Sequence, residues 1–178
     1  MKILLYLVAG VVGLVVAAVL VLMLMSFRKG AGTMTTAIEI DRPPEAVWPW
    51  LTQADKQKKW VSWLVDVRDL TPEITGVGKK FAWVMDDPNM KKQVEIQGEL
   101  IAEEPLRLSR VRLTSEIGFE GTSTWTLTDL GGRTRFESVG SFRYDKWLYR
   151  LMEPLITPQA VKKQELDFAK LKSLIEAN

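Results

Sequence analysis

The hydrophobic pattern begins with a continuous apolar run, because no charged residue occurs between Ile3 and Met25. As a helix this run would be about 34 Å long, enough to cross a hydrocarbon core of about 30 Å. It is longer than the apolar core of a secretory signal peptide, and Arg28-Lys29 follows where a cleavage site would be expected. The pattern therefore favours a retained single-pass anchor over residues 1–30.

Residues 31–35 are expected to form a short linker, which would keep the following domain beside the lipid bilayer. The basic residues that flank the apolar run give only a slight preference for a cytoplasmic domain. Ala9, Gly13 and Ala17 recur at every fourth position, a spacing that lets two helices approach closely. A weak homodimer through this helix is therefore one reading, and the ordinary composition of a membrane helix is the other.

After the linker, the pattern changes to alternation of apolar and polar residues, which is typical of strands with one wet face. In 119–127, for example, threonines alternate with Trp125 and Leu127. The segments that read as strands are 36–40, 64–68, 79–85, 93–101, 106–114, 119–127 and 134–142.

Helical spacing appears in two short segments, 44–51 and 54–60, and in a long segment at the end of the chain. Between 158 and 175, Val161, Gln164, Phe168, Leu171 and Ile175 form one stripe. A shorter helical piece is predicted over 146–152. Because proline removes a backbone hydrogen bond, Pro154 is expected to separate the two. The fold class is therefore α+β, in one domain over 36–178.

The strand 106–114 does not fit a simple alternation. In a regular strand, Leu106 and Leu108 would lie on one face, and Val111 and Leu113 would lie on the opposite face. A bulge near Ser109-Arg110 would reconcile them. Without a bulge, an arginine at 110 or 112 would point inward and would need an anionic partner, which a ligand could supply.

The order of elements and several local motifs resemble the START/Bet v1-like (SRPBCC) superfamily, in particular its polyketide cyclase/dehydrase and lipid-transport group. The motifs are the entry segment 38–48 (IEIDRPPEAVW), Trp60, the 76–78 turn, the paired strands at 124–127 and 134–137, and the ending 171–176 (LKSLIE). The resemblance covers the chain after the anchor and linker. It implies a helix-grip fold, in which a curved antiparallel sheet wraps the last helix and leaves an apolar cavity between them.

Composition removes several kinds of chemistry. The chain has no histidine and no cysteine, so it has no Ser-His-Asp or Cys-His site and no thiolate metal site. Glu103-Glu104 reads as a solvated loop, and no pair of carboxylates stands out. No catalytic residue, metal or cofactor is therefore predicted. Lys56, Lys58 and Lys59 read as a solvated face, so nucleic acid is not an expected partner.

The predicted cavity wall consists of large apolar residues on the inward strand faces and on the stripe of the last helix, with one polar residue. These candidates for ligand binding are Phe81, Trp83, Met85, Trp125, Phe136, Phe142, Gln164, Phe168 and Leu171. For each of them, plain core packing is the alternative. Such a wall suits a hydrophobic ligand, and Gln164 is a candidate for its polar head.

The segment 144–156 mixes aromatic and basic residues, which is typical of a membrane interface. Trp147, Tyr149 and Leu151 are the predicted membrane contacts, and the segment is also expected to border the cavity mouth. The leading hypothesis is a membrane-anchored module that binds a lipid, isoprenoid or quinone-like molecule. The alternatives are a cyclase or dehydratase acting on an apolar substrate, and a non-catalytic assembly factor.

Overall fold

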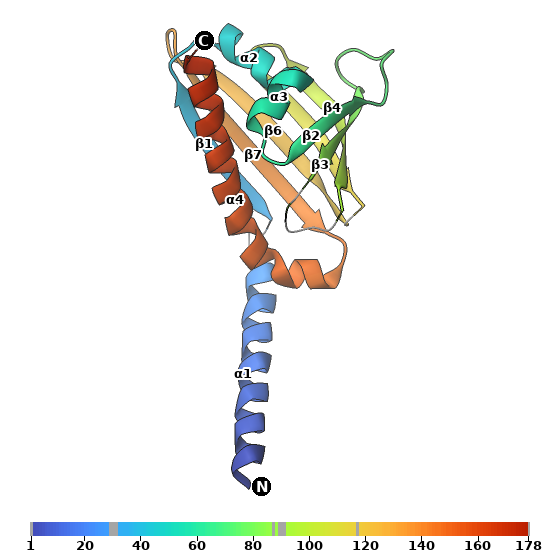
Figure 1. The fold of residues 1–178 in the computed structure, drawn as a ribbon, viewed down its shortest axis with the longest axis vertical. Helices are drawn as coiled ribbons and strands as arrows, with labels where there is room; N and C mark the ends of the chain where they lie inside the picture. The colour runs from blue at the N-terminus through green and yellow to red at the C-terminus, as the bar shows by residue number, and fades with distance from the viewer. Residues whose placement is uncertain (1, 29–31, 87, 89–91, 117, 178) are drawn as a thin grey trace.

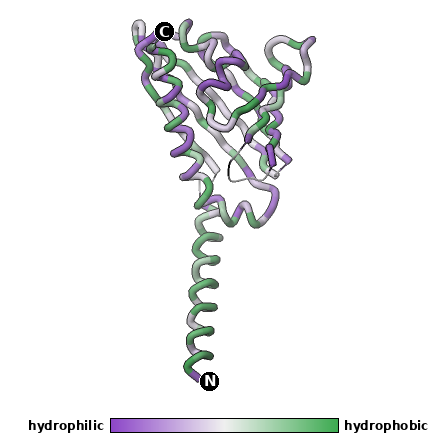
Figure 2. Tube along the Cα trace, viewed as in Figure 1, coloured by the Kyte–Doolittle hydropathy of each residue, from purple (hydrophilic) through white to green (hydrophobic). Residues whose placement is uncertain are grey.

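A computed structural model describes residues 2–28, 32–86, 88, 92–116 and 118–177. The first helix, α1 (Lys2–Ser26), projects from a domain in which helices lie on one face of a sheet (Figure 1). Figure 2 shows α1 as continuously apolar, whereas the domain alternates in hydropathy. Among the described residues, α1 is the single helix long and apolar enough to cross a membrane. The expected boundary between anchor and linker, at residues 30 and 31, lies outside the described residues.

The sheet contains the seven predicted strands, and every neighbouring pair is antiparallel. Its order is β1-β7-β6-β5-β4-β3-β2. The strands are β1 (Thr33–Ile40), β2 (Leu64–Asp69), β3 (Lys80–Met85), β4 (Val94–Glu104), β5 (Leu108–Ser115), β6 (Phe119–Asp129) and β7 (Thr134–Tyr144). Strand β1 begins three residues earlier than alternation predicts, because Thr33 already pairs with Ser141 of β7.

Three helices lie on the inner face of the sheet: α2 (Pro44–Thr52), α3 (Ala54–Trp60) and α4 (Trp147–Glu176). Strand β6 turns Ser123 and Leu127 inward, whereas its threonines lie on the outer face, as predicted. The buried core lies between α4, α2, α3 and the strands β1, β6 and β7. Its residues are Ile40, Val47, Trp50, Leu51, Trp60, Leu127, Phe136, Phe168, Leu171 and Ile175.

The last helix is continuous from Trp147 to Glu176, so the predicted separation at Pro154 is wrong. The helix instead bends in the part that holds Pro154 and Pro158 (Figure 1). Pro154 cannot donate to the carbonyl of Arg150, four residues earlier. That carbonyl lies 2.7 Å from the Ser26 hydroxyl of α1, whose proton it shares with the carbonyl of Leu22 at 2.8 Å. A contact with a remote helix therefore satisfies the carbonyl that the proline leaves free.

The end of α1 is fixed to α4 mainly through the buried carboxylate of Glu153. Arg28 donates to both of its oxygens, at 2.8 and 3.2 Å, and the backbone N–H of Gly32 donates at 2.8 Å. Thr157 adds a third donor at 2.7 Å. Burial opposes ionisation of Glu153, but these donors outweigh it and hold its pKa below the usual value.

The bulge lies on β4, between Leu100 and Ala102, directly opposite Val111 and Arg110, so it is carried by the partner of β5 and not by β5 itself. Leu106 has a positive φ in the turn before β5, so it does not belong to that strand. Because β5 itself is regular, Arg110 and Arg112 both point to the outer face and are exposed. The bulge instead changes which residues of β4 face inward.

We expect Phe168→Ala to lower the free energy of unfolding by about 3–5 kcal/mol, because it leaves a cavity against Phe136 and Trp60. Phe168 is 2% exposed. The matched control is Leu166→Ala on the same helix, where the side chain is 65% exposed and the change should stay within about 0.5 kcal/mol. Denaturant unfolding of the full chain in detergent, followed by near-UV circular dichroism, measures both. Equal losses would mean that the buried face of α4 is wrongly assigned.

Candidate ligand cavity

A cavity of about 340 Å³ lies between the short helices α2 and α3 and the inner face of strands β2 to β6. This size falls within the range of small-molecule sites in proteins. Its lining residues are Leu51, Thr52, Ala54, Gln57, Val67, Asp69, Gly76, Lys79, Phe81, Trp83, Leu100, Glu103, Ser109, Val111 and Trp125. The helices α2 and α3, and the strand ends nearest them, lie in the half of the domain farther from α1 (Figure 1).

Aromatic rings form one side of the cavity. The rings of Phe81 and Trp83 lie 5.5 Å apart, and those of Trp83 and Trp125 are stacked at 6.2 Å. Gly98 lies directly beneath Phe81, since a Cβ there would come within 2.3 Å of the Phe81 ring. Glycine at this position therefore lets the ring lie flat against the sheet. The result is an apolar wall with large, well-packed contact surfaces.

Trp125 separates this cavity from the closed core. Its ring lies 6.2 Å from that of Trp83 on the cavity side, and 6.0 Å from those of Trp60 and Phe136 on the core side. The Phe136 ring in turn contacts that of Phe168 at 4.5 Å. A series of ring contacts thus runs from the cavity into the core beneath α4.

The other side of the cavity is polar and partly exposed to solvent. Lys79 forms an ion pair with Asp69 at 2.7 Å. The hydrogen bond from Lys79 is the main reason that the pKa of Asp69 lies below its ordinary value. Gln57 is buried at the roof and donates to the carbonyl of Leu51. Ser109 and Glu103 face each other across the β4–β5 ladder. These groups mark the end at which the cavity opens.

Glu103 corrects one prediction, because it lines the cavity and does not lie in a solvated loop. Because of the β4 bulge, Glu103 lies on the same face of the sheet as Leu100, which also lines the cavity. Within the part of the chain that the structure describes, the Glu103 carboxylate makes no hydrogen bond or ion pair. It is therefore available to a ligand that carries a donor or a positive charge.

Hydrogen bonds hold the roof of the cavity in place. The indole N–H of Trp60 on α3 donates to the carbonyl of Trp50 on α2 at 2.9 Å. Asp167 of α4 is buried, accepts from the Ser62 backbone N–H at 3.1 Å, and also bonds the Ser62 hydroxyl. Lys163 completes this cluster at 2.7 Å from Asp167. The short helices are therefore fixed to each other and to α4.

The predicted site residues fall into two groups. Phe81, Trp83 and Trp125 line the cavity, whereas Phe136, Phe168 and Leu171 are buried in the core. The resemblance implied a cavity between the sheet and the last helix, but no residue of α4 is among those that line this one. The physical reason is that Phe136 and Phe168 close that side by direct ring contact.

The remaining predicted residues lie away from the cavity. Met85 pairs with Leu64 and Val94 at the far end of β3. Phe142 packs over Gly121 and Gly140, near α1. Gln164 donates to the Ser138 hydroxyl at 3.1 Å, and its buried carbonyl oxygen has no partner among the described residues. Whether these residues contact a ligand stays a prediction.

Sequence reasoning missed the polar lining residues and several apolar ones. Val67 and Asp69 share the inner face of β2 with Trp83 and Phe81 of β3, and alternation with β3 could have placed them there. Gln57 and Ala54 lie on α3, which is too short for its sequence to show an amphipathic stripe. Glu103 could not have been found, because its facing depends on the position of the bulge.

The segment expected at the cavity mouth lies elsewhere. No residue from 147 to 151 lines the cavity, and this beginning of α4 lies at the end of the domain from which α1 projects (Figure 1). The prediction that it borders the mouth is therefore wrong. Tyr149 is half-buried, with its ring 6.1 Å from that of Tyr144. Membrane contact by Trp147, Tyr149 and Leu151 stays a prediction.

A curved antiparallel sheet around a long C-terminal helix, with a cavity beside it, defines the class of SRPBCC-type helix-grip proteins. The chain belongs to the polyketide cyclase/dehydrase and lipid transport family, whose sequence profile matches residues 31–176. A search of curated proteins finds no match.

Solved structures with the same fold include three bacterial proteins of low sequence identity. A conserved protein from Geobacillus kaustophilus has a TM-score of 0.67 at 13% identity, over 80% of this chain and 94% of its own. A protein from Rhodobacter sphaeroides has a TM-score of 0.66 at 15% identity, over 83% of this chain and 93% of its own. A protein from Chromobacterium violaceum has a TM-score of 0.63 at 15% identity, over 82% of this chain and 97% of its own. These similarities show a shared fold.

We expect Lys79→Gln to raise the pKa of Asp69 toward its ordinary value of about 3.9, because it removes the main hydrogen bond to the carboxylate. NMR titration of the Asp69 carboxyl carbon measures the change. The matched control is Lys80→Gln, an exposed neighbour that should leave the titration unaltered. If Asp69 titrated identically in wild type and Lys79→Gln, the ion pair at the cavity would not exist in solution.

Proposed function

We propose that this protein is a membrane-anchored module that binds a hydrophobic or amphiphilic small molecule in the cavity beneath α2 and α3. The observation that carries the proposal is the division of the cavity into an aromatic wall and a polar, partly exposed end. Such a cavity matches a ligand with a long apolar part and one polar group. Lipids, isoprenoids and quinones share this chemistry, and membership of a family described by lipid transport supports it.

The membrane anchor in this proposal is α1. Its side chains are almost all exposed in the isolated chain, although nearly all of them are apolar. Exposing so much apolar surface to water is unfavourable, whereas a bilayer would bury it. The contacts of Ser26 and Arg28 with α4 also give this helix a defined junction with the domain.

A second candidate function is acid–base catalysis on an apolar substrate, as the cyclase and dehydrase part of the family description suggests. The observation that favours it is the Glu103 carboxylate at the cavity, which lacks a bonding partner among the described residues. The two functions differ in outcome. A binding module releases its molecule unchanged, whereas a dehydratase releases a product that has lost one water.

We expect a long-chain fatty acid bearing a diazirine group to crosslink to peptides from β3 and β6, which carry Phe81, Trp83 and Trp125. Val111→Trp should reduce this labelling at least tenfold, because the indole would occupy the cavity. The matched control is Val139→Trp, on the outer face of β7, which should leave labelling unchanged. Mass spectrometry of the digested full chain identifies the peptides. Equal labelling of these peptides in wild type and Val111→Trp would contradict binding in this cavity.

We expect the protein to remain in the membrane fraction after alkaline carbonate extraction, with residues 1–28 still attached. The reason is the long apolar α1, which such extraction does not release from a bilayer. N-terminal sequencing of the mature protein and fractionation measure both properties. A mature N-terminus beyond Arg28, together with recovery in the soluble fraction, would show that α1 is a cleaved signal sequence.

A further inference from the structure

Large apolar side chains are exposed at the beginning of α4. Trp147 is 74% exposed, Leu148 51% and Leu155 47%. At 100° per residue these three, together with Leu151, occupy one stripe of the helix, and Glu153 lies on the opposite side. Glu153 is only 4% exposed and is covered by the protein, whereas Trp147, Leu148 and Leu155 on the opposite side are left uncovered. We call residues 147–155 the interfacial segment.

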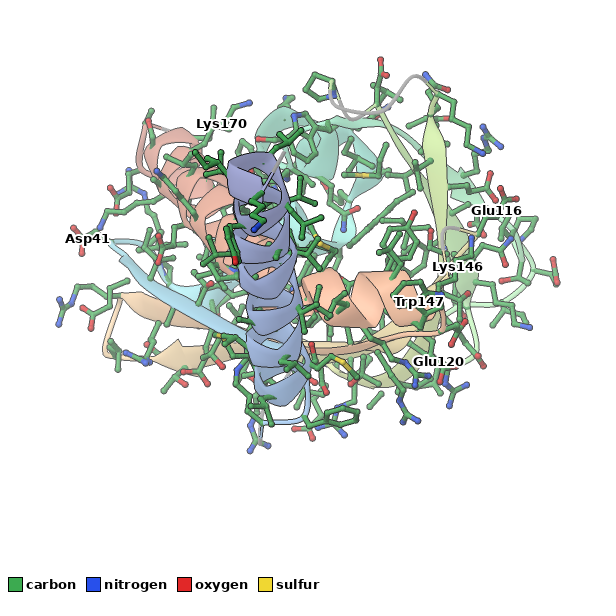
Figure 3. All side chains as sticks on the ribbon, turned by 90° about the horizontal axis from the view of Figure 1, so that it is seen from below. Asp41, Glu116, Glu120, Lys146, Trp147 and Lys170 are labelled. Atoms are coloured by element: carbon green, nitrogen blue, oxygen red, sulfur yellow. The ribbon has the colours of Figure 1, made fainter. Side chains whose placement is uncertain are left out.

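The interfacial segment lies at the level where α1 ends. Figure 3 shows it from the side on which α1 projects, running across this end of the domain beside α1, with Trp147 at its outer part. Phe27, just after α1, is also exposed and lines the same surface hollow as Arg150 and Glu153. The apolar stripe and the apolar α1 are therefore neighbours, although they are far apart in the sequence.

Several independent contacts fix the interfacial segment to the end of α1. Ser26 bonds the carbonyl that Pro154 leaves free, and Arg28 forms a two-point ion pair with Glu153. The N–H of Gly32, just before β1, bonds the same carboxylate. A charged group as buried as Glu153 needs such partners, because an unpaired charge would be costly there. These contacts hold α1, α4 and the start of the sheet together.

We propose that the interfacial segment lies on the surface of the same bilayer that α1 crosses, and that the Glu153 contacts hold the domain in this position. A bilayer fits this surface because the exposed apolar stripe lies beside the end of the apolar helix α1 (Figure 3). Tryptophan at the outer part of the segment suits the boundary between headgroups and acyl chains.

The charges at this end of the domain indicate how the contact forms. Near the interfacial segment, the charged residues that contacts or Figure 3 place there include Arg28, Arg143, Lys146 and Arg150, against Glu116, Glu120, Asp145 and Glu153. Among these described residues four positive and four negative charges balance, and Lys29, next to Arg28 in the sequence, adds one positive charge. Attraction to anionic lipids is therefore weak, and burial of the apolar stripe supplies the contact. Binding should depend little on anionic lipid content.

This position determines where the cavity lies. Strand β4 has 11 residues. At about 3.3 Å per residue such a strand is roughly 35 Å long, and its far end lies in the half of the domain farther from α1 (Figure 1). The exposed cavity residues Asp69 and Lys79 belong to that far end. If the cavity binds a ligand as proposed above, the ligand enters from the aqueous side and not directly from the lipid around α1.

The first experiment measures the depth of the interfacial segment. The chain has no cysteine, so Leu148→Cys and Leu155→Cys can each carry one spin label in the full chain, reconstituted in phosphatidylcholine vesicles. The matched control is Leu166→Cys, an exposed position farther along α4. We expect labels at 148 and 155 to be reached by oxygen several-fold better than by a water-soluble nickel chelate, and the label at 166 to show the reverse. Adding phosphatidylglycerol should not change this.

Two outcomes would overturn the bilayer contact. One is equal access of the nickel chelate to positions 148 and 166, which would place the stripe in water. The other is spin–spin broadening at 148 that disappears on dilution with unlabelled protein, which would mean that a second copy covers the stripe. No ligand is used, so either failure leaves the proposed binding function untouched.

The second experiment tests the Glu153 contacts. A donor dye at Val77→Cys, an exposed position beside Gly76 of the cavity, reports energy transfer to acceptor lipids in the bilayer surface. We expect weak transfer from position 77 and strong transfer from position 148. Arg28→Gln and Glu153→Gln should each raise transfer from position 77 at least twofold, because the domain would tilt. Arg133→Gln, which breaks a remote surface ion pair, should not.

Near-UV circular dichroism shows whether each variant keeps its folded domain. Arg28 lies outside the sheet and the core, so Arg28→Gln keeps the test decisive even if Glu153→Gln unfolds the protein. Unchanged transfer from position 77 in folded Arg28→Gln would contradict the role of these contacts. Transfer from position 77 as strong as that from position 148 in the wild type would contradict the upright position.

Discussion

The width of the sheet is the constraint on which the rest of the structure depends. Seven strands spaced by about 4.8 Å span roughly 29 Å, whereas one helix covers about 10 Å. Helix α4 therefore closes only the side of β1 and β7, where Phe136 and Phe168 meet. The short helices α2 and α3 cover the other side incompletely, and the uncovered volume is the cavity. The cavity thus results from the mismatch between a wide sheet and the helices that cover it.

The two ends of the domain differ in their polar contacts. At one end, Arg28 and Ser26 join the end of α1 to α4 through hydrogen bonds to the Glu153 carboxylate and to the carbonyl of Arg150. At the other end, Lys79 and Asp69 form an exposed ion pair beside the cavity. The closed core between them, with Trp125 at its boundary, separates the junction of α1 with α4 from the cavity. The junction with α1 and the cavity therefore occupy one small domain without sharing residues.

Alternation and helical spacing predicted the seven strands, the short helices and the inward position of Phe81, Trp83 and Trp125, because these depend on local pattern alone. The failures have tertiary causes. Strand β4 takes up the bulge expected in β5, which brings Glu103 to the cavity. Helix α4 continues through Pro154, because Ser26 of a remote helix bonds the freed carbonyl of Arg150. Neither the position of the β4 bulge nor the contact from Ser26 can be read from a local sequence pattern.

The most direct test of the central claim is native mass spectrometry of the full chain, released from its membrane in a mild detergent. If the cavity beneath α2 and α3 holds an amphiphilic molecule, wild-type protein should retain a small-molecule mass that Val111→Trp loses and Val139→Trp keeps. The account would be contradicted if wild type carried no such mass after exposure to native lipid extract. It would equally be contradicted if all three proteins retained the same mass in the same amount.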